Sequence, residues 1–321
     1  MRYYQRDGKP TTELLAVKAS LKRMVALYAD LAVAAFGPLA LKAVRESMIG
    51  ETVKHSGVPL SRSTINDHVS RIRRMFRWAA ENELIDGEIY HRLLAVRGLA
   101  YGRGGRETPK RRPVARADVD AALKNLAPRV RAMVELQWTT GMRPGEVVIL
   151  RTSDVDTSGP VWVYTPAHHK TEHHGHERRI ALGPRAQEVL RPWLRPEDPN
   201  TWLFQPAEAE MSRRARLREA RIAAGDGSGG SRKPRARRPR RPPGERYTTE
   251  SYRRAVERAC ERAGIAVRTP HQLRHSFATR VRAAFNLDAA RAALGHAGAD
   301  VTLDYAEVDA GRAAEVTARM G

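Results

Sequence analysis

The spacing of apolar residues between residues 61 and 85 restricts the fold of this chain more than any other feature. These residues recur at intervals of three and four, so in a helix they form one continuous apolar stripe. The stripe consists of Ile65, Val69, Ile72, Phe76 and Ala79. Similar spacing recurs at 12–33, 39–49 and 87–98. Because such stripes are stable mainly when they pack together, we predict a small helical bundle over the first hundred residues.

A different face of the helix expected at 61–85 carries His68, Arg71 and Arg74. Cations in such a row are placed to meet phosphate groups or a DNA groove. A solvated charged face explains the same pattern for a single helix, so both interpretations stay open. On the first of them, Arg71 and Arg74 are predicted DNA-binding residues.

The segment AYGRGGRETPKRRP (100–113) divides the chain, because its glycines, its cations and its final proline are typical of a linker. Beyond it, two short strand-like runs within 160–183 predict a β-hairpin. Further helices are expected at 116–126, 128–140, 184–194, 248–264 and from 270 onward. The predicted fold class is therefore mainly α (α+β) with one small antiparallel sheet. The expected domains are a helical bundle at 1–99 and a second domain at 114–321.

The net charge of the chain is strongly positive. The 57 Lys and Arg residues exceed the 36 Asp and Glu residues by 21. Such an excess is typical of proteins that bind nucleic acid, with an anionic membrane surface as the weaker alternative. Residues 213–246 hold thirteen Lys or Arg against three acids, and their repeated Pro and Gly disfavour regular structure. We predict a flexible basic insertion at about 208–246, with Arg235, Arg237 and Arg238 as DNA-binding residues.

Cysteine content and hydropathy indicate where the protein acts. Cys260 is the only cysteine, so the chain has no internal disulfide, as expected in a reducing compartment. Its helix-spaced neighbours predict that the thiol packs in a core. The longest apolar run, at 31–41, contains Gly-Pro and is too short to cross a bilayer. We expect a soluble, cytoplasmic, nucleoid-associated protein that does not bind a membrane.

The segment TTGMRPGE (139–146) places Arg143 directly before an expected helix start. Pro144 suits the first turn of a helix, and the free N–H groups of a helix start attract phosphate. Glu146 follows one turn later and is placed to hold the Arg143 guanidinium. An ordinary turn arginine fits the same position, so this segment does not define a site by itself.

The segment TPHQLRHSFATR (269–280) gathers three basic side chains at another expected helix start. His271, Arg274 and His275 lie at i, i+3 and i+4, so they share one face of the helix. No carboxylate occurs between residues 269 and 286, although arginine is rarely buried without a partner. We infer that the missing anion comes from outside the protein.

Lys170 is the only lysine of the expected hairpin, and five histidines surround it. They are His168, His169, His173, His174 and His176. A lysine at a hairpin tip is usually just solvated. Histidine clusters bind metals, yet no cysteine and no helical His-x-x-x-His pair accompanies these. Adventitious metal binding or phosphate contact is the preferred interpretation, and no metal site is predicted.

The segment LGHAGADVTLDYAE (294–307) contains His296 and, nine residues later, Tyr305. Most tyrosines only pack against their neighbours. A phenol with a pKa of about 10 is barely ionised at neutral pH, so a nucleophilic tyrosine needs cations, a base and a neutralised electrophile. The segments around Arg143, Lys170 and Arg274 contain side chains of these kinds.

Taken in order, these motifs resemble the signature of the tyrosine recombinases, the phage-integrase and Xer-type family. TTGMRPGE is similar to the TGxRxxE box, HQLRHSFAT is similar to HxLRHxxAT, and LGH is followed nine residues on by tyrosine. The similar region spans roughly 115–310, and the expected N-terminal bundle resembles the family's core-binding domain. The long histidine-rich hairpin and the basic insertion are additions to the minimal family pattern.

The resemblance implies a site-specific DNA recombinase or integrase that breaks and rejoins DNA strands, with a mobile element as the expected context. Arg143 and Arg274 would hold the oxygens of the scissile phosphate and neutralise its charge in the transition state. Tyr305 would attack phosphorus and form a 3′-phosphotyrosyl bond. Because this bond stores the energy of the phosphodiester, the resemblance implies no metal, no ATP and no other cofactor.

The resemblance also implies roles for the remaining side chains of these motifs. His271 would act as general base, and Lys170 would protonate the leaving 5′ oxygen. His296 would donate a hydrogen bond to the phosphate. Glu146 and His275 would support the side chains that contact the phosphate.

The partners implied by the resemblance are double-stranded DNA, other copies of the same chain and accessory directionality proteins. The two domains would close around the duplex, and four protomers would assemble on it. Two alternatives stay open: a catalytically silent DNA-binding relative, and a monomeric type IB-like topoisomerase with the same tyrosine chemistry. Relaxation of supercoiled DNA without a specific site would favour the topoisomerase.

Overall fold

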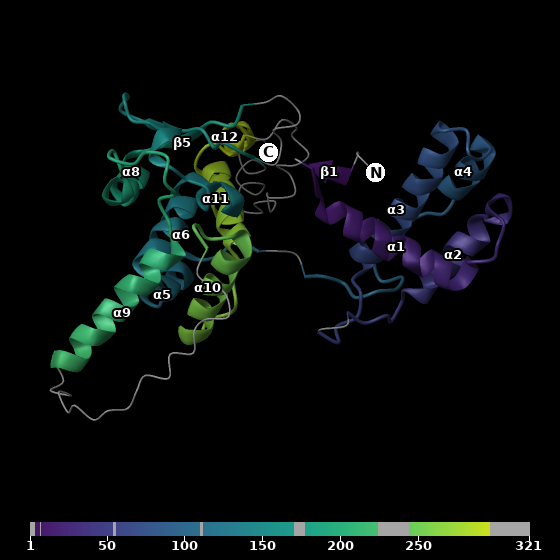
Figure 1. The fold of residues 1–321 in the computed structure, drawn as a ribbon, viewed down its shortest axis with the longest axis horizontal. Coiled ribbons are helices and arrows are strands. Elements are labelled where there is room, and N and C mark those ends of the chain that lie inside the picture. The colour runs from purple at the N-terminus through teal and green to yellow at the C-terminus, as the bar shows by residue number, and fades with distance from the viewer. Residues whose placement is uncertain are drawn as a thin grey trace, which may run out of the picture. The chain divides into compact units, whose positions relative to one another are not determined.

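The computed structural model describes residues 4–6, 8–53, 56–109, 112–169, 177–223 and 244–295. Its contacts divide the chain into two compact units, Met1–Lys110 and Arg111–Gly321, and Figure 1 shows the ribbon of each unit. Both units consist mostly of helices, and the larger unit also contains a small antiparallel sheet. The predicted fold class is confirmed.

The described part of the first unit is a helical bundle. Its helices are α1 (Thr12–Tyr28), α2 (Pro38–Ser47), α3 (Arg62–Glu81) and α4 (Gly87–Leu94), with a short 3₁₀ turn, η2 (Val33–Ala35). Helix α3 packs against α1, α2 and α4. A short hairpin of β1 (Gln5–Arg6) and β2 (Lys9–Pro10) precedes the bundle, and the sequence did not predict it because two-residue strands show no alternation.

The apolar stripe of α3 forms the centre of this first core. Ser61 begins the helix by accepting a hydrogen bond from the Thr64 amide through its side chain, which satisfies one of the free donors of the first turn. Four residues of the predicted stripe are fully buried, and these are Ile65, Val69, Ile72 and Phe76. Phe76 stacks on Phe36, which lies between η2 and α2, with ring centroids 5.0 Å apart.

The second unit surrounds one central helix. The helices are α5 (Arg116–Lys124), α6 (Pro128–Thr140), α7 (Pro144–Val147), α8 (Pro184–Leu190), α9 (Pro206–Ala223), α10 (Thr249–Arg262), α11 (Pro270–Ala284) and α12 (Leu287–Leu294), with 3₁₀ turns η3 (Thr152–Asp154) and η5 (Arg191–Trp193). Helix α6 packs against α8, α10 and α11 and lies among them in Figure 1. It is apolar on several faces and is buried nearly all round, as expected of a central helix.

The sheet of the second unit has three strands in the order β3–β4–β5, all antiparallel. The strands are β3 (Val155–Asp156), β4 (Trp162–Tyr164) and β5 (Ile180–Leu182). Trp162 pairs with Leu182 and Tyr164 with Ile180, and all four side chains are buried on one face. The predicted hairpin is therefore present as β4 and β5. The added strand β3 is too short to be read from its sequence.

Helix α9 corrects the prediction of a flexible insertion that starts near residue 208. Residues 206–223 are helical, because the repeated Pro and Gly occur only after this stretch, which is rich in Ala, Glu and Arg. Glu208 anchors the helix by binding both Arg129 and Arg195. Glu210 pairs with Arg213 and Arg214 one turn on, the spacing that supports a helix. Residues 224–243 lie outside the described residues.

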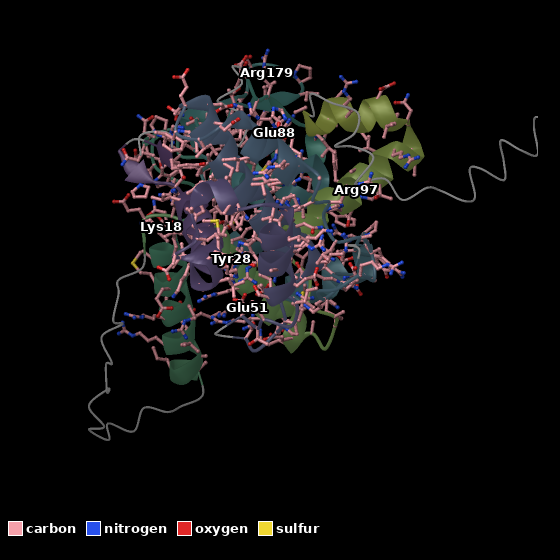
Figure 2. The ribbon with its side chains drawn as sticks, turned by 90° about the vertical axis from the view of Figure 1, so that its right-hand side faces the viewer. Lys18, Tyr28, Glu51, Glu88, Arg97 and Arg179 are labelled. Carbon is pink, nitrogen blue, oxygen red and sulfur yellow. The ribbon has the colours of Figure 1, made fainter. Side chains whose placement is uncertain are left out.

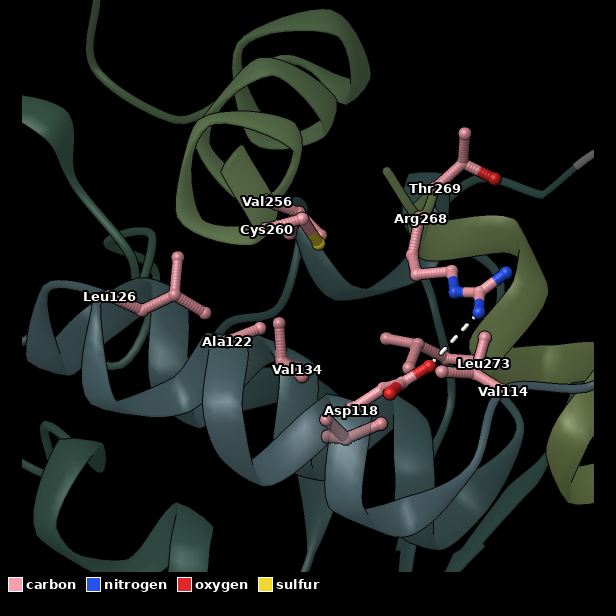
Figure 3. Close-up of a pocket in the computed structure, with 11 residues that line it drawn as sticks. Val114, Asp118, Ala122, Leu126, Val134, Val256, Cys260, Arg268, Thr269 and Leu273 are labelled. Carbon is pink, nitrogen blue, oxygen red and sulfur yellow. Dashed lines mark hydrogen bonds and ion pairs between the residues drawn. The ribbon is translucent and has the colours of Figure 1, made fainter. Parts of the chain in front are cut away.

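A small apolar cavity of about 20 Å³ lies between α5, α10 and α11 (Figure 3). Val256 and Cys260 from α10 and Leu273 from α11 line it, and the ion pair between Arg268 and Asp118 is at its edge, at 2.9 Å. The volume is close to that of one water molecule, but an apolar lining offers such a water few partners. Cys260 is buried, as predicted, and burial raises the pKa of its thiol.

Candidate active site

The turn between α6 and α7 sets the position of Arg143. Gly141 ends α6 with φ of 66°, a left-handed conformation that glycine adopts without strain. A Cβ at this position would lie 2.3 Å from Cδ1 of Phe277, so the turn also needs the absence of a side chain. Two residues later, Arg143 is the N-cap of α7 and Pro144 occupies its first turn, as the sequence predicts.

Glu146 holds both the backbone and the side chain of Arg143. Its Oε2 accepts a hydrogen bond from the Arg143 amide at 2.6 Å, and its Oε1 accepts one from Nη1 of the guanidinium at 2.9 Å. The predicted contact is therefore present. Glu146 is only 2 % exposed. The buried Tyr164 of β4 donates its hydroxyl proton to the Glu146 carbonyl at 2.7 Å, which ties α7 to the sheet.

Arg178 is a buried cation of this site that the sequence analysis missed. Its side chain is 4 % exposed, and its Nε lies 3.4 Å from Oε1 of Glu146. The missed signal is the alternation that leads into β5, because residues 178, 180 and 182 are buried whereas 177, 179 and 181 are exposed. An arginine in line with Ile180 and Leu182 must enter the core unless the strand ends first.

The Glu146 carboxyl is ionised at neutral pH despite its burial. Burial alone would raise its pKa, but the charge of Arg178, the amide and guanidinium of Arg143 and the charge of Arg274 together lower the pKa below its usual value. Three guanidinium groups therefore act on one carboxylate. Among the described side chains this leaves an excess of positive charge at the site.

Arg274 is the most deeply enclosed of these cations, with no exposed surface at all. Its Nη1 donates to the Gly141 carbonyl at 2.8 Å, and its Nη2 donates to the Leu294 carbonyl at 2.9 Å. These carbonyls lie at the C-terminal ends of α6 and α12, where backbone acceptors have no partner within the helix and a positive charge is favoured. The guanidinium therefore holds three helices, α6, α11 and α12, at one point.

His271 and His275 lie on the first two turns of α11, next to this point. Both are half-buried, and their rings meet edge to face with centroids 5.6 Å apart. Pro270 and the capping box between Thr269 and Gln272 start the helix, so the predicted helix start is observed. The structure thus brings Arg143, Glu146, Arg274 and the two histidines together around the ends of α6, α7 and α11.

Several predicted site residues lie outside the described residues. These are Lys170, His296 and Tyr305, together with Arg235, Arg237 and Arg238 of the basic insertion. Gly295, which directly precedes His296, ends α12 with φ of 63°. Of the five hairpin histidines, His168 and His169 are described. Within the described ranges, no three His, Cys, Asp or Glu side chains gather closely enough to hold a metal ion.

His68 does not lie on the exposed basic face that the sequence analysis considered for α3. His68 is buried, and its Nδ1 lies 2.8 Å from the Ser20 hydroxyl. Burial, followed by the charges of Arg23 and Arg71, lowers the pKa of His68. The suggested phosphate contact of His68 is therefore wrong, because the helix turns this side chain into the bundle. Arg71 and Arg74 both bind Glu13 of α1, and Arg74 keeps 47 % of its side chain exposed.

Comparison with known proteins identifies the class. Residues 115–312 match the model of the phage integrase family, which is well over half of the chain. The chain therefore belongs to the phage integrase family and is a tyrosine-type site-specific DNA recombinase.

Within the part of the chain that the structure describes, no helix is long and apolar enough to cross a membrane.

Its relatives include the Xer recombinases. Tyrosine recombinase XerC of Yersinia pestis is 26 % identical over 261 residues, which cover 78 % of this chain and 70 % of that protein. Tyrosine recombinase XerD of Ralstonia nicotianae is 28 % identical over 256 residues, covering 77 % and 69 %. The structure of the Tn1549 transposon integrase in complex with transposon right end DNA is similar in fold, with a TM-score of 0.63, 17 % identity and coverage of 98 % and 95 %.

Proposed function

We propose that this recombinase cleaves DNA through Tyr305, forms a 3′-phosphotyrosyl intermediate and releases a free 5′-hydroxyl. The observation that carries this proposal is the position of Arg274, which is fully buried and held by the carbonyls that end α6 and α12. These two neutral carbonyls orient the guanidinium. Arg274 is thus preorganised to stabilise negative charge that develops nearby.

The charge balance of the site favours a phosphate diester as the bound group. Among the described side chains, Arg143, Arg178 and Arg274 act on the carboxylate of Glu146. Buried positive charge in excess of its counter-ions is costly, and an anion that enters the site removes this cost. A phosphate diester gains a second negative charge in the pentacoordinate transition state, so the excess charge stabilises the transition state more than the ground state.

We assign the remaining roles on the family motifs. Arg143 and Arg274 hold the non-bridging oxygens, and His271 takes the proton of the attacking hydroxyl as general base. Lys170 protonates the leaving 5′ oxygen, and His296 donates a hydrogen bond to the phosphate. Glu146 fixes Arg143, and His275, whose ring packs on that of His271, supports the base.

Double-stranded DNA and further copies of the chain are the proposed partners. The XerH site-specific recombinase was solved bound to its difH substrate, and lambda integrase was solved as a tetramer bound to a Holliday junction. We propose that this chain likewise acts as a tetramer on DNA, with directionality proteins as accessory partners and a mobile element as its context.

The two units have separate proposed tasks on that DNA. The unit at 1–110 binds the duplex beside the cleavage site, and Arg74, whose side chain is 47 % exposed, contacts phosphate together with Arg71. The unit at 111–321 performs cleavage. Residues 224–243 add Arg235, Arg237 and Arg238 as contacts to phosphates outside the core site.

A nicked suicide substrate tests the function directly. Such DNA traps the covalent intermediate, because the short fragment that carries the new 5′-hydroxyl diffuses away and cannot religate. The natural attachment DNA of the element that encodes the protein serves as substrate. Wild-type protein is expected to form an adduct that survives denaturation, while Tyr305→Phe, which loses only the hydroxyl, binds the DNA and forms none. An adduct with Tyr305→Phe at the wild-type rate would show that another residue is the nucleophile.

A further inference from the structure

Arg178 lies at the active site without a role in the reaction as described above. Arg178 lies two residues before the start of β5, and its side chain is buried. Its neighbour Arg179, labelled in Figure 2, is exposed. Burying a guanidinium is costly unless hydrogen bonds and a counter-charge compensate the loss of water. When the hydrogen bonds and counter-charge of a buried arginine are incomplete, the groups that it contacts indicate why it is buried.

The contacts of Arg178 are few and weak for a side chain that is 4 % exposed. Its Nε lies 3.4 Å from Oε1 of Glu146, and its Nη1 lies 3.4 Å from the Arg179 carbonyl. Its Nη2 is buried and has no hydrogen-bond partner among the described residues. Both distances exceed the 2.9–3.0 Å that is usual for N–H···O bonds. Arg178 therefore acts on Glu146 mainly through its charge.

The same guanidinium lies against the end of α12. A Cβ on Gly295 would be 2.3 Å from Nη1 of Arg178, so the guanidinium in its observed position leaves no space for a side chain there. Arg178 thus touches the backbone of the residue before His296, while its other edge faces the carboxylate that fixes Arg143. One buried side chain bridges the start of α7, the strand β5 and the end of α12.

Glu146 depends on this second cation. Its Oε2 binds the Arg143 amide, and its Oε1 lies between the guanidinium groups of Arg143 and Arg178. If Arg178 were neutral, the buried carboxylate would lose its largest favourable charge interaction, and its hold on the Arg143 guanidinium would weaken. A small displacement of a transition-state contact is enough to slow the reaction strongly.

We propose that Arg178 is a positioning residue for DNA cleavage: it holds the Glu146 carboxylate in place, and thereby fixes the Arg143 guanidinium and the end of α12 around the phosphate. This inference rests on the proposed function of the site. It assigns no contact between Arg178 and DNA, so the effect of the residue is on the rate of cleavage and not on DNA affinity.

Arg178→Met and Arg178→Lys in the full-length chain test the proposal, with Arg179→Met as the control that removes the same charge one residue away. On the nicked suicide substrate, Arg178→Met is expected to form adduct about 100-fold more slowly, the size of effect that misplacement of a reacting group produces. Arg178→Lys keeps the charge but not the planar fork, and is expected to lose about 10-fold. Arg179→Met is expected to match the wild type, and uncleaved duplex is expected to bind all variants equally.

A double-mutant cycle with Glu146→Gln separates positioning from a general effect on folding. Once the carboxylate is gone, Arg178 is an uncompensated buried charge, so Arg178→Met in the Glu146→Gln background is expected to raise stability and to leave the adduct rate unchanged. An equal rate loss in both backgrounds would mean that Arg178 acts without Glu146, and would overturn the proposal.

Each remaining outcome also has one meaning. If the wild type forms no adduct, the proposed function fails before Arg178 is tested. If the wild type forms adduct and Arg178→Met behaves like Arg179→Met, the function stands and the positioning role is wrong. If Arg178→Met does not fold, Arg178→Gln decides, because a folded variant that lacks the charge and still reacts at the wild-type rate contradicts the proposal.

Discussion

Replacing Glu146 by Gln removes the carboxylate that the described residues place between the site arginines and keeps the shape of the side chain. Glu146 is 2 % exposed and forms ion pairs with Arg143 and Arg178. When Glu146 is replaced by a neutral side chain, both guanidinium groups lose this counter-ion. Removal of one partner from a buried ion pair costs about 3–5 kcal/mol. This cost arises mostly because the guanidinium groups remain buried without that partner, and less from the lost contact itself.

The chain offers a matched control on its surface. Arg185 and Glu188 form a pair with the same i, i+3 spacing as Arg143 and Glu146, at 3.0 Å compared with 2.9 Å, but their side chains are 70 % and 65 % exposed. Exposed pairs of this kind contribute about 0–1 kcal/mol. Glu188→Gln therefore isolates the effect of burial, since chemistry, spacing and distance are shared.

The buried thiol of Cys260 provides the assay. Cys260 is the only cysteine of the chain and is 1 % exposed, so its labelling in a urea titration reports unfolding of the second unit alone. With a slope of about 2–3 kcal/mol/M, a cost of about 3–5 kcal/mol is expected to lower the urea midpoint of Glu146→Gln by about 1–2.5 M. Glu188→Gln is expected to lower it by less than about 0.5 M.

The stability difference between wild type and Glu146→Gln should also depend on pH in a defined direction. The pKa of folded Glu146 lies below its usual value of 4.5, so the ionised carboxylate stabilises the fold above that pH and the stabilisation is lost as the pH falls through the folded pKa. The gap between wild type and Glu146→Gln is therefore expected to close in acid. Equal midpoints for Glu146→Gln and Glu188→Gln at pH 7 would refute the central place of this carboxylate.

Three further predictions concern the turn, the cofactor and the insertion. Gly141→Ala is expected to destabilise the second unit several times more than Gly264→Ala, because its Cβ would meet Phe277. Gly264 is a matched control, since its φ is 67° compared with 66° at Gly141 and the space around it is open. Equal urea midpoints for the two variants would contradict this. Adduct formation is expected to persist in excess EDTA, and loss of activity that a single divalent ion restores would overturn the metal-free mechanism. If residues 224–243 make about six phosphate contacts, their deletion lowers the slope of log affinity against log salt by about five units and barely changes base preference; an unchanged slope would leave the insertion without a DNA-binding role.

The local geometry around Arg143 and Arg274 was predictable from sequence because it follows local rules. A proline after an N-cap position, a glutamate one turn later and the i, i+3 spacing of basic residues each act within a few residues. The contact between Arg143 and Glu146 follows from such spacing alone. The helix bundle was predictable for the same reason, since the stripe of α3 is continuous over four turns.

The partners of these side chains were not predictable, because they come from distant parts of the chain. Arg274 lies 133 residues from Gly141, and Arg178 lies 32 residues from Glu146. From sequence, an external anion is expected for Arg274 because no carboxylate occurs between residues 269 and 286. In the structure, two of its hydrogen bonds go to carbonyls at helix ends. Only the alternation of Arg178 with Ile180 and Leu182 signals that a cation enters the core there.

The flexible insertion was predicted to start too early, near residue 208, for a simpler reason. The disfavouring effect of Pro and Gly was extended over the whole basic stretch, although the first part, up to Ala223, contains neither after Pro206. Charge content alone does not prevent a helix when acids stand three or four residues from the arginines. Glu210 with Arg213 and Arg214 is such an arrangement.

The most direct measurement of the central claim is to map the atom that joins protein to DNA. Wild-type adduct from the suicide substrate is digested with protease and nuclease, and the modified peptide is identified by mass spectrometry. The proposed mechanism predicts one modified peptide, with a 3′-phosphonucleotide on Tyr305, and a free 5′-hydroxyl on the other DNA end. A nucleotide attached to any other residue, or attached to Tyr305 through a 5′-phosphate, would contradict the mechanism.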